Sequence, residues 1–161
     1  MWLGLSLFYV GAVLFLNGLW MLGKIADKEI WVINIFTGVV SLCIGLASIF
    51  GPAADAASVK SGALTLLFAF TYLWVAFNRF TGADGRGLGW FSLFVAVTAV
   101  PVALDTLTSA SSGLDWWMGI NWAAWAVLWA LFFALLALKK SIERPTGWLC
   151  IAQGVLTGWV P

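Results

Sequence analysis

The chain has 161 residues, of which 63% are hydrophobic and only 9% charged, and its formal net charge is +1. Soluble domains carry about a quarter charged residues, so this composition excludes a water-soluble globular protein and indicates a protein that lies in lipid. The near-neutral charge excludes a basic surface for nucleic acid, and the absence of histidine removes a common metal ligand and the usual pH sensor.

The predicted membrane helices follow one another with short polar connections. The apolar runs are Trp2–Leu22, Ile30–Phe50, Ala63–Phe80, Leu88–Leu107, Trp116–Leu138 and Gly147–Val160. The first five have about the 17–25 residues that a helix needs to cross the hydrocarbon core. The sixth is shorter, and we expect it to be truncated where the printed sequence stops. Continuous apolar runs favour helices over barrel strands, so residues 1–161 are predicted to form one all-α transmembrane domain.

The basic residues are divided unequally between the connections. The connections that follow odd-numbered helices contain seven of the eight basic residues: Lys24, Lys28, Arg79, Arg86, Lys139, Lys140 and Arg144. Only Lys60 lies in a connection that follows an even-numbered helix. The positive-inside rule therefore predicts a multi-pass protein of the cytoplasmic membrane with its N-terminus outside. The outer connections, 51–62 and 108–115, are predicted to be small polar loops.

Short features recur along the chain. Phe8-Tyr9-Val10 is similar to Phe70-Thr71-Tyr72, and the end of the fourth helix is similar to the end of the sixth. Three helical hairpins, one–two, three–four and five–six, would explain this and would enclose a central pathway in each protomer. Glycine pairs seven residues apart, such as Gly11 with Gly18, predict close helix packing.

Aromatic and amide side chains are the candidates for a solute pathway. Trp122, Trp125 and Trp129 stand at i, i+3 and i+7, so they form one stripe on the fifth helix. Such a stripe is typical of helix packing, and it also offers flat faces to a planar neutral solute. Asn17 and Gln153 either link neighbouring helices or hydrogen-bond a urea or amide solute. Both interpretations stay open at this point.

Charged and reactive groups are scarce inside the apolar runs. Asp105 lies near the end of the fourth helix, where we expect it to face water. No series of acids crosses the helices, so proton coupling is not favoured. No nucleophile–base pair, metal cluster or phosphate loop is present. We therefore predict that the chain is not an enzyme and needs no metal or cofactor.

Longer motifs resemble a known family. They are Leu3-Gly4-Leu5, Tyr9-Val10-Gly11, Asn17-Gly18, Phe70-Thr71-Tyr72-Leu73, Trp90 to Ala96, Val100-Pro101, Asp115-Trp116-Trp117, Trp125 to Trp129, Gly154 to Thr157 and Trp159-Val160-Pro161. Together they cover nearly the whole chain and resemble the acid-activated urea channels and amide transporters of the UreI/AmiS group. The resemblance implies a bacterial inner-membrane homohexamer with one pore in each six-helix protomer. It also implies a functional link to an amidase or a urease.

The resemblance also implies a set of pore residues. They are Leu3, Leu7, Val10, Leu14, Asn17, Phe70, Trp74, Trp122, Trp125, Leu128, Trp129 and Gln153. Gln153 stands where the urea channels have an acid, and Trp74 where they have a phenol, so the choice between urea and acetamide stays open. The short, histidine-free segment 51–62 predicts that acid does not gate the pore.

We therefore predict a passive channel for urea or small aliphatic amides, with membrane lipid around it. Two alternatives remain. A membrane scaffold that transports nothing would explain the glycines and tryptophans equally well. A proton-coupled amide symporter is the other, and it lacks a buried titratable series.

Overall fold

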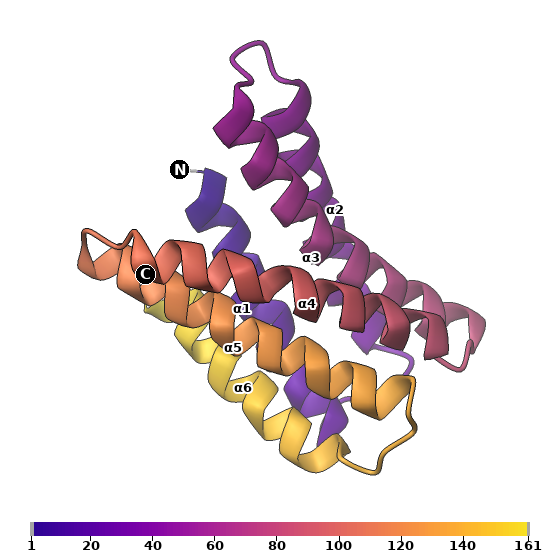
Figure 1. The fold of residues 1–161 in the computed structure, drawn as a ribbon. Helices are drawn as coiled ribbons and strands as arrows, with labels where there is room; N and C mark the ends of the chain where they lie inside the picture. The colour runs from indigo at the N-terminus through magenta and orange to yellow at the C-terminus, as the bar shows by residue number, and fades with distance from the viewer. Residues whose placement is uncertain (1, 161) are drawn as a thin grey trace.

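The computed structural model describes residues 2–160, with side chains from residue 4 onward. It consists of the helices α1 (Trp2–Met21), α2 (Ile30–Phe50), α3 (Ala56–Thr81), α4 (Arg86–Thr108), α5 (Gly113–Leu136) and α6 (Glu143–Trp159) (Figure 1). The helices α1 to α5 are long and apolar enough to cross a membrane. Helix α6 is shorter, with 17 residues. The all-helical prediction is confirmed.

Four helices begin earlier than the apolar runs, and in two of them, α3 and α5, polar residues cap the new start. The Asp55 carboxylate accepts a hydrogen bond from the Ser58 N–H at 2.7 Å, and the Ser58 hydroxyl oxygen accepts one from the Asp55 N–H at 2.8 Å. This capping box starts α3 at Ala56. Ser112 and Asp115 form a second capping box that starts α5 at Gly113. The predicted bounds of the two outer loops, 51–62 and 108–115, were therefore wrong. Only residues 51–55 and 109–112 lie outside helices.

The helices pack most closely in three antiparallel pairs, α2 with α3, α4 with α5, and α1 with α6. Figure 1 shows the α2–α3 pair inclined away from α4 and α5, with α1 running behind α4 and α5 in this view. The predicted hairpins one–two, three–four and five–six are consecutive in the chain, but they are not the closely packed pairs. The arrangement in three hairpins around a pore stays a prediction.

Small residues explain why the first and last helices pair. A Cβ atom on Gly18 would lie 2.6 Å from the Gly147 carbonyl oxygen, and one on Gly154 would lie 2.6 Å from the Phe15 nitrogen. The two backbones therefore approach as closely as glycine permits, which is the usual device for helix contact in lipid. The packing expected of Gly18 thus occurs within one protomer.

Charged contacts mark the two ends of the bundle. The end that carries the seven basic residues other than Lys60 is called the basic end below. There Arg79 lies 3.9 Å from Asp27, and the Lys139 ammonium donates a 2.7 Å hydrogen bond to the Asp84 carbonyl oxygen. At the Lys60 end, Lys60 pairs with Asp105 at 3.1 Å across α3 and α4. The Asp105 side chain is 67% exposed.

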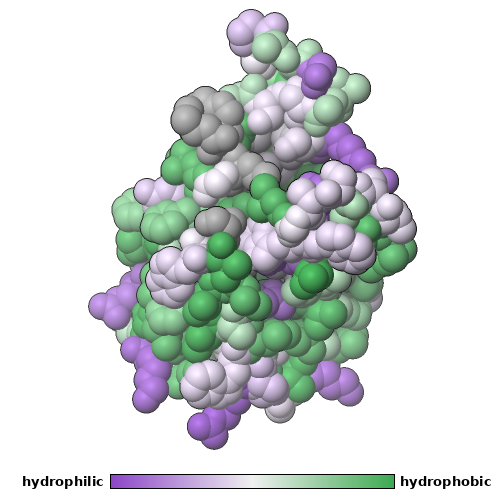
Figure 2. All heavy atoms as spheres, turned by 90° about the vertical axis from the view of Figure 1, so that its left-hand side faces the viewer, coloured by the Kyte–Doolittle hydropathy of each residue, from purple (hydrophilic) through white to green (hydrophobic). Residues whose placement is uncertain are grey.

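The outer surface carries many large apolar side chains. Large hydrophobic side chains on all six helices lie more than half exposed, among them Phe8, Phe36, Phe50, Phe77, Phe80, Trp90, Phe94, Ile120 and Trp148. Hydrophobic residues also cover much of the face in Figure 2. A surface of this kind requires lipid or other subunits around it, because water would leave so much apolar area unfavourably hydrated.

Candidate functional site

Two cavities enter the bundle from opposite ends. The basic-end cavity has a volume of about 450 Å³ and reaches Asp27, Arg79 and Lys139. The Lys60-end cavity has a volume of about 270 Å³ and reaches Lys60 and Asp105. Among the described residues, the rings of Phe68 and Trp125 are the ones that line both cavities. These two rings therefore form the partition between the cavities.

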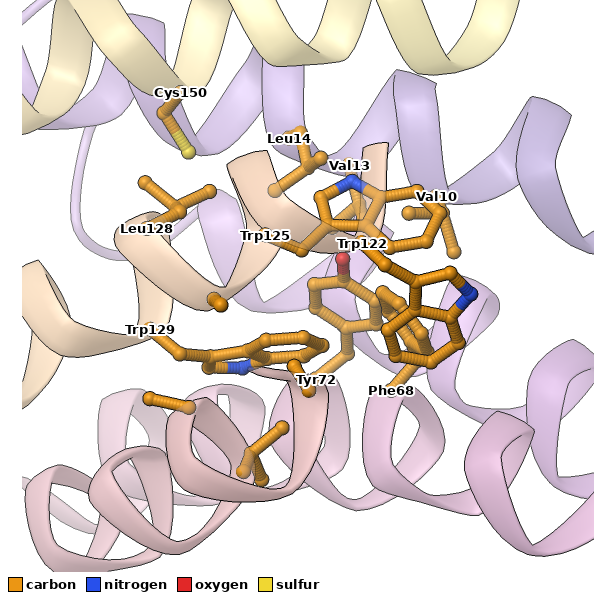
Figure 3. Close-up of a cluster of buried hydrophobic side chains, with 14 of the residues drawn as sticks. Val10, Val13, Leu14, Phe68, Tyr72, Trp122, Trp125, Leu128, Trp129 and Cys150 are labelled. Atoms are coloured by element: carbon orange, nitrogen blue, oxygen red, sulfur yellow. The ribbon is translucent and has the colours of Figure 1, made fainter. Parts of the chain in front are cut away.

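The partition belongs to a cluster of aromatic rings, Phe68, Trp122, Trp125 and Trp129, which we call the aromatic neck. The centroid of the Phe68 ring lies 5.0 Å from that of Trp125, 4.9 Å from that of Trp129 and 5.8 Å from that of Trp122. Figure 3 shows these rings close together, with Tyr72 beside them. The Phe68 and Trp125 planes meet at 82°, the edge-to-face arrangement that aromatic quadrupoles favour.

Hydrogen bonds from α6 set the position of the Trp125 ring. The indole Nε1–H donates to the Thr157 hydroxyl at 3.2 Å, and that hydroxyl donates to the Asn121 side-chain oxygen at 3.3 Å. Asn121 in turn donates to the Trp117 carbonyl oxygen at 2.8 Å. Trp125, Thr157 and Asn121 are all buried, so this series of bonds is protected from competing water. Sequence reasoning did not link Thr157 to the tryptophan stripe.

The amide of Asn17 faces the basic-end cavity and also links two helices. Its Nδ2 donates to the Asn34 oxygen at 3.1 Å, and the Asn34 Nδ2 donates back to the Asn17 oxygen at 2.7 Å. Asn34 also donates to the Ile30 carbonyl oxygen at 2.9 Å. The reciprocal pair joins α1 to α2. Each amide keeps further donor or acceptor capacity, since an amide offers two N–H groups and two lone pairs.

Helix α3 turns one face toward the basic-end cavity. The lining residues recur with helical spacing: Phe68, Thr71, Tyr72, Val75, Asn78 and Arg79. Phe70 and Trp74, which the family resemblance implied as pore residues, line neither cavity. Phe70 is 45% exposed, and Trp74 packs against Phe91 of α4 at a centroid distance of 5.6 Å. A residue two positions from Phe68 necessarily points to the opposite side of the helix.

The structure places the other predicted residues individually. Leu7, Val10 and Trp122 line the Lys60-end cavity, whereas Leu14, Asn17, Leu128 and Trp129 line the basic-end cavity. Leu3 lies outside the described side chains. Gln153 is buried but lines neither cavity. Its Nε2 donates to the Ala124 carbonyl oxygen at 2.8 Å, so in this structure Gln153 ties α6 to α5.

Charges stay at the mouths of the cavities. At the basic end, the Arg86 backbone N–H donates to Asp84 at 3.0 Å and the Arg86 Nε–H donates at 2.5 Å. These bonds, the backbone one first, hold the pKa of Asp84 below its usual value. No cluster of three metal-ligating His, Cys, Asp or Glu side chains occurs among the described residues. The deep lining is therefore aromatic, aliphatic and amide-bearing.

Residues 2–161 match the sequence profile of the AmiS/UreI family transporters. The chain belongs to this family. It is 42% identical over 159 residues to a Mycolicibacterium smegmatis protein named provisionally as an amidate substrates transporter, covering 98% of this chain and 73% of that protein. It is 37% identical over 185 residues to the acid-activated urea channel of Helicobacter pylori, covering 99% of this chain and 94% of the channel.

Solved structures of the Helicobacter pylori urea channel share the fold of this AmiS/UreI protein. The cryo-electron microscopy structure of that channel in a closed state superposes with a TM-score of 0.87 at 39% identity, covering 99% of this chain and 94% of the channel. The crystal structure gives a TM-score of 0.86 at 40% identity, with the same coverage. The family and the apolar helices identify the chain as a multi-pass membrane protein of the channel and transporter class.

Proposed function

We propose that this AmiS/UreI protein is a passive channel for urea or small aliphatic amides. The observation that carries the proposal is the meeting of two cavities, open at opposite ends, at the partition formed by Phe68 and Trp125. A small movement of these rings would join the cavities into one path. A path with a single thin partition suits downhill diffusion of a solute that is small enough to pass between aromatic rings.

The chemistry of the neck favours a flat, neutral solute. Phe68, Trp125 and Trp129 are buried rings whose faces can stack on a planar amide. They cannot replace the hydration of an ion, so an ion would pass only at a prohibitive desolvation cost. No carboxylate belongs to the neck, which argues against a proton-coupled symporter.

Relatives support both candidate solutes. The Helicobacter pylori relative is named as a urea channel, and the Mycolicibacterium smegmatis relative carries an amidate transporter name. By the family resemblance, Gln153 stands where the urea channels have an acid. This difference favours the amide branch. We propose that both urea and acetamide pass, and that the ratio of their rates identifies the physiological solute. An amidase or a urease on the cytoplasmic side would consume it.

We further propose that acid does not open this pore. The chain contains no histidine, and the connection 51–55 is short. The alignment with the acid-activated relative extends over 185 positions, whereas this chain has 161 residues. The relative therefore contains segments that have no counterpart in this chain. The simplest acid sensor, a histidine in an added outer segment, is therefore missing from this sequence.

The proposed setting is a homohexamer in the bacterial cytoplasmic membrane with the N-terminus outside. The seven basic residues at the basic end support this orientation through the positive-inside rule. Exposed rings such as Phe77, Phe80 and Phe94 support contact with neighbouring protomers or lipid. Chemical crosslinking in membranes, read as a ladder that stops at six subunits, tests the assembly.

Stopped-flow light scattering on proteoliposomes tests the function directly. We expect urea and acetamide to enter severalfold faster than into empty liposomes, without saturation, and glycerol to enter more slowly. Trp129→Leu should alter these rates, whereas Trp116→Leu, on the same helix but 53% exposed, should not. Entry no faster than into empty liposomes from a folded oligomer would favour the scaffold. Uncoupler-sensitive accumulation would favour the symporter.

A further inference from the structure

The basic-end cavity contains an amide side chain that the fold does not use. Asn78 of α3 lines the cavity and is only 4% exposed. Its side chain forms no hydrogen bond with any residue in the described part of the chain, and its polar atoms are not sealed from the cavity. A buried amide normally has partners, because leaving it without them is unfavourable. The missing partner of Asn78 must therefore come from whatever occupies the cavity.

Three other polar side chains that line this cavity are already engaged. The Thr71 and Ser92 hydroxyls donate to carbonyl oxygens of their own helices, at 2.7 Å and 2.8 Å. Asn17 is paired with Asn34. Helix α4 begins beside Asn78, whose Nδ2 lies 3.9 Å from where a Cβ on Gly85 would stand. Asp84 nevertheless accepts the first free N–H there, that of Arg86, and among the described residues Asn78 forms no capping bond to this helix.

We propose that Asn78 is a docking site for the carboxamide or urea group of the permeating solute. This proposal rests on the proposed function and adds a solute-recognising residue to it. An amide side chain and an amide solute can exchange two hydrogen bonds, N–H to C=O in each direction, as Asn17 and Asn34 do in this protein. A polyol such as glycerol has no group of this shape. Asn78 therefore selects for amides before the solute reaches the rings.

The position of Asn78 suits a first station on a path. It lies on the mouth side of Tyr72, which lines the same cavity beside the aromatic neck. Six residues of helix separate the two side chains, about 9 Å along the axis at 1.5 Å per residue. A solute held at Asn78 is thus still outside the neck, in the wider part of the cavity. Conduction requires several weak sites of this kind rather than one strong site.

The test compares solute selectivity rather than activity alone. Asn78→Leu keeps the size of the side chain and removes its donors and acceptors. In stopped-flow proteoliposome assays, we expect the ratio of urea to glycerol permeability, and of acetamide to glycerol permeability, to fall about fivefold, the factor that corresponds to about 1 kcal/mol for one net neutral hydrogen bond. Asn78→Gln, which retains the amide, should keep most of the ratio. Phe77→Leu, at the adjacent outward-facing position, should leave it unchanged.

Each other outcome counts against the proposal in a distinct way. If wild type conducts urea and Asn78→Leu keeps the wild-type ratio, the docking site is wrong while the channel stands. If Asn78→Leu lowers the urea and glycerol rates equally, Asn78 is structural and the proposal fails. If wild type conducts neither urea nor acetamide, the channel and its docking site fail together. Should Asn78→Leu not assemble, Asn78→Thr removes the amide with a smaller change, and the same ratios decide.

Discussion

The ring of Phe68 stands edge-to-face against that of Trp125, and these two side chains line the cavities on both sides of the partition. A helix residue from α3 and one from α5 thus close the path together. The rings are neutral and buried, so their contact is held by dispersion and quadrupole forces rather than by a salt bridge. A contact of this kind yields easily, which is what a narrow passage for neutral solutes requires.

Removing one ring should widen the passage. Phe68→Ala deletes a side chain that contacts three tryptophans, so we expect glycerol entry to rise severalfold and discrimination against glycerol to fall. Phe70→Ala is the matched control, because it lies two residues away on the same helix and is 45% exposed. The measurement is stopped-flow entry of urea and glycerol. Equal effects of the two substitutions would contradict the assignment of the neck.

The hydroxyl of Thr157 should control the same selectivity through Trp125. Thr157→Val removes the acceptor of the indole N–H and leaves that donor unpaired, at a cost of about 1–3 kcal/mol. We expect the ring to take other positions and the urea-to-glycerol ratio to change, with Thr157→Ser restoring it. Thr146→Val is the control, since Thr146 is equally buried on α6 but bonds only the Ile142 carbonyl oxygen of its own turn. A shift in selectivity of the same size in Thr146→Val would rule out a specific role for Thr157.

The Asn17–Asn34 pair should behave as a single unit in stability measurements. Asn17→Leu or Asn34→Leu alone leaves one amide unpaired between α1 and α2, and each should lower the free energy of unfolding. The double substitution should cost less than the two single changes together, with a coupling of about 0.6–1.7 kcal/mol, as for other interhelical bonds in membranes. Denaturation in mixed detergent micelles gives the three free energies. Strict additivity would show that the pair contributes nothing as a pair.

Close packing of α1 on α6 predicts a position-dependent effect of one methyl group. Gly18→Ala would place a Cβ 2.6 Å from the Gly147 carbonyl oxygen, and such overpacking typically costs about 1–3 kcal/mol. Gly4→Ala, on the same helix with nothing within 4 Å, should be close to neutral. Thermal unfolding in detergent compares the two. If both variants melt together with wild type, the α1–α6 contact is looser than described.

Acid should have little effect on conduction between pH 7 and pH 5. The pKa of Asp84, at the mouth of the basic-end cavity, is lowered by the Arg86 backbone N–H and by the Arg86 side chain. A lowered pKa means that the carboxylate stays ionised, and its bonds to Arg86 stay intact, until the pH falls below the usual range for aspartate.

The check is urea entry at pH 5 and pH 7 into liposomes of the same protein density. We expect rates within a factor of two, an estimate that rests on the absence of histidine. A steep rise at pH 5, such as the name of the Helicobacter pylori relative describes for that channel, would overturn the proposal that this chain is ungated by acid.

The sequence by itself determined the class of molecule, the number and order of the helices and the end at which the basic residues gather. These properties follow from composition and from the length of apolar runs, which are local and additive along the chain. Local rules also explain the tryptophan stripe, because Trp122, Trp125 and Trp129 share one helix face whatever packs against it. The helix starts at Ala56 and Gly113 were missed only because polar capping residues lie outside the apolar runs.

Only the tertiary structure decided which helices pair and which face of α3 meets the tryptophans. In lipid all faces of these helices are apolar, so hydrophobic periodicity does not distinguish the face that packs inside from the face that meets lipid. Phe68 and Phe70 are therefore equivalent by composition, and the choice between them depends on how α3 is rotated against α5. The same holds for Asn17, Asn78 and Gln153, three buried amides of which one is paired, one is free in the cavity and one is bonded to a backbone carbonyl. Partners from distant helices decide that difference, and no local pattern specifies them.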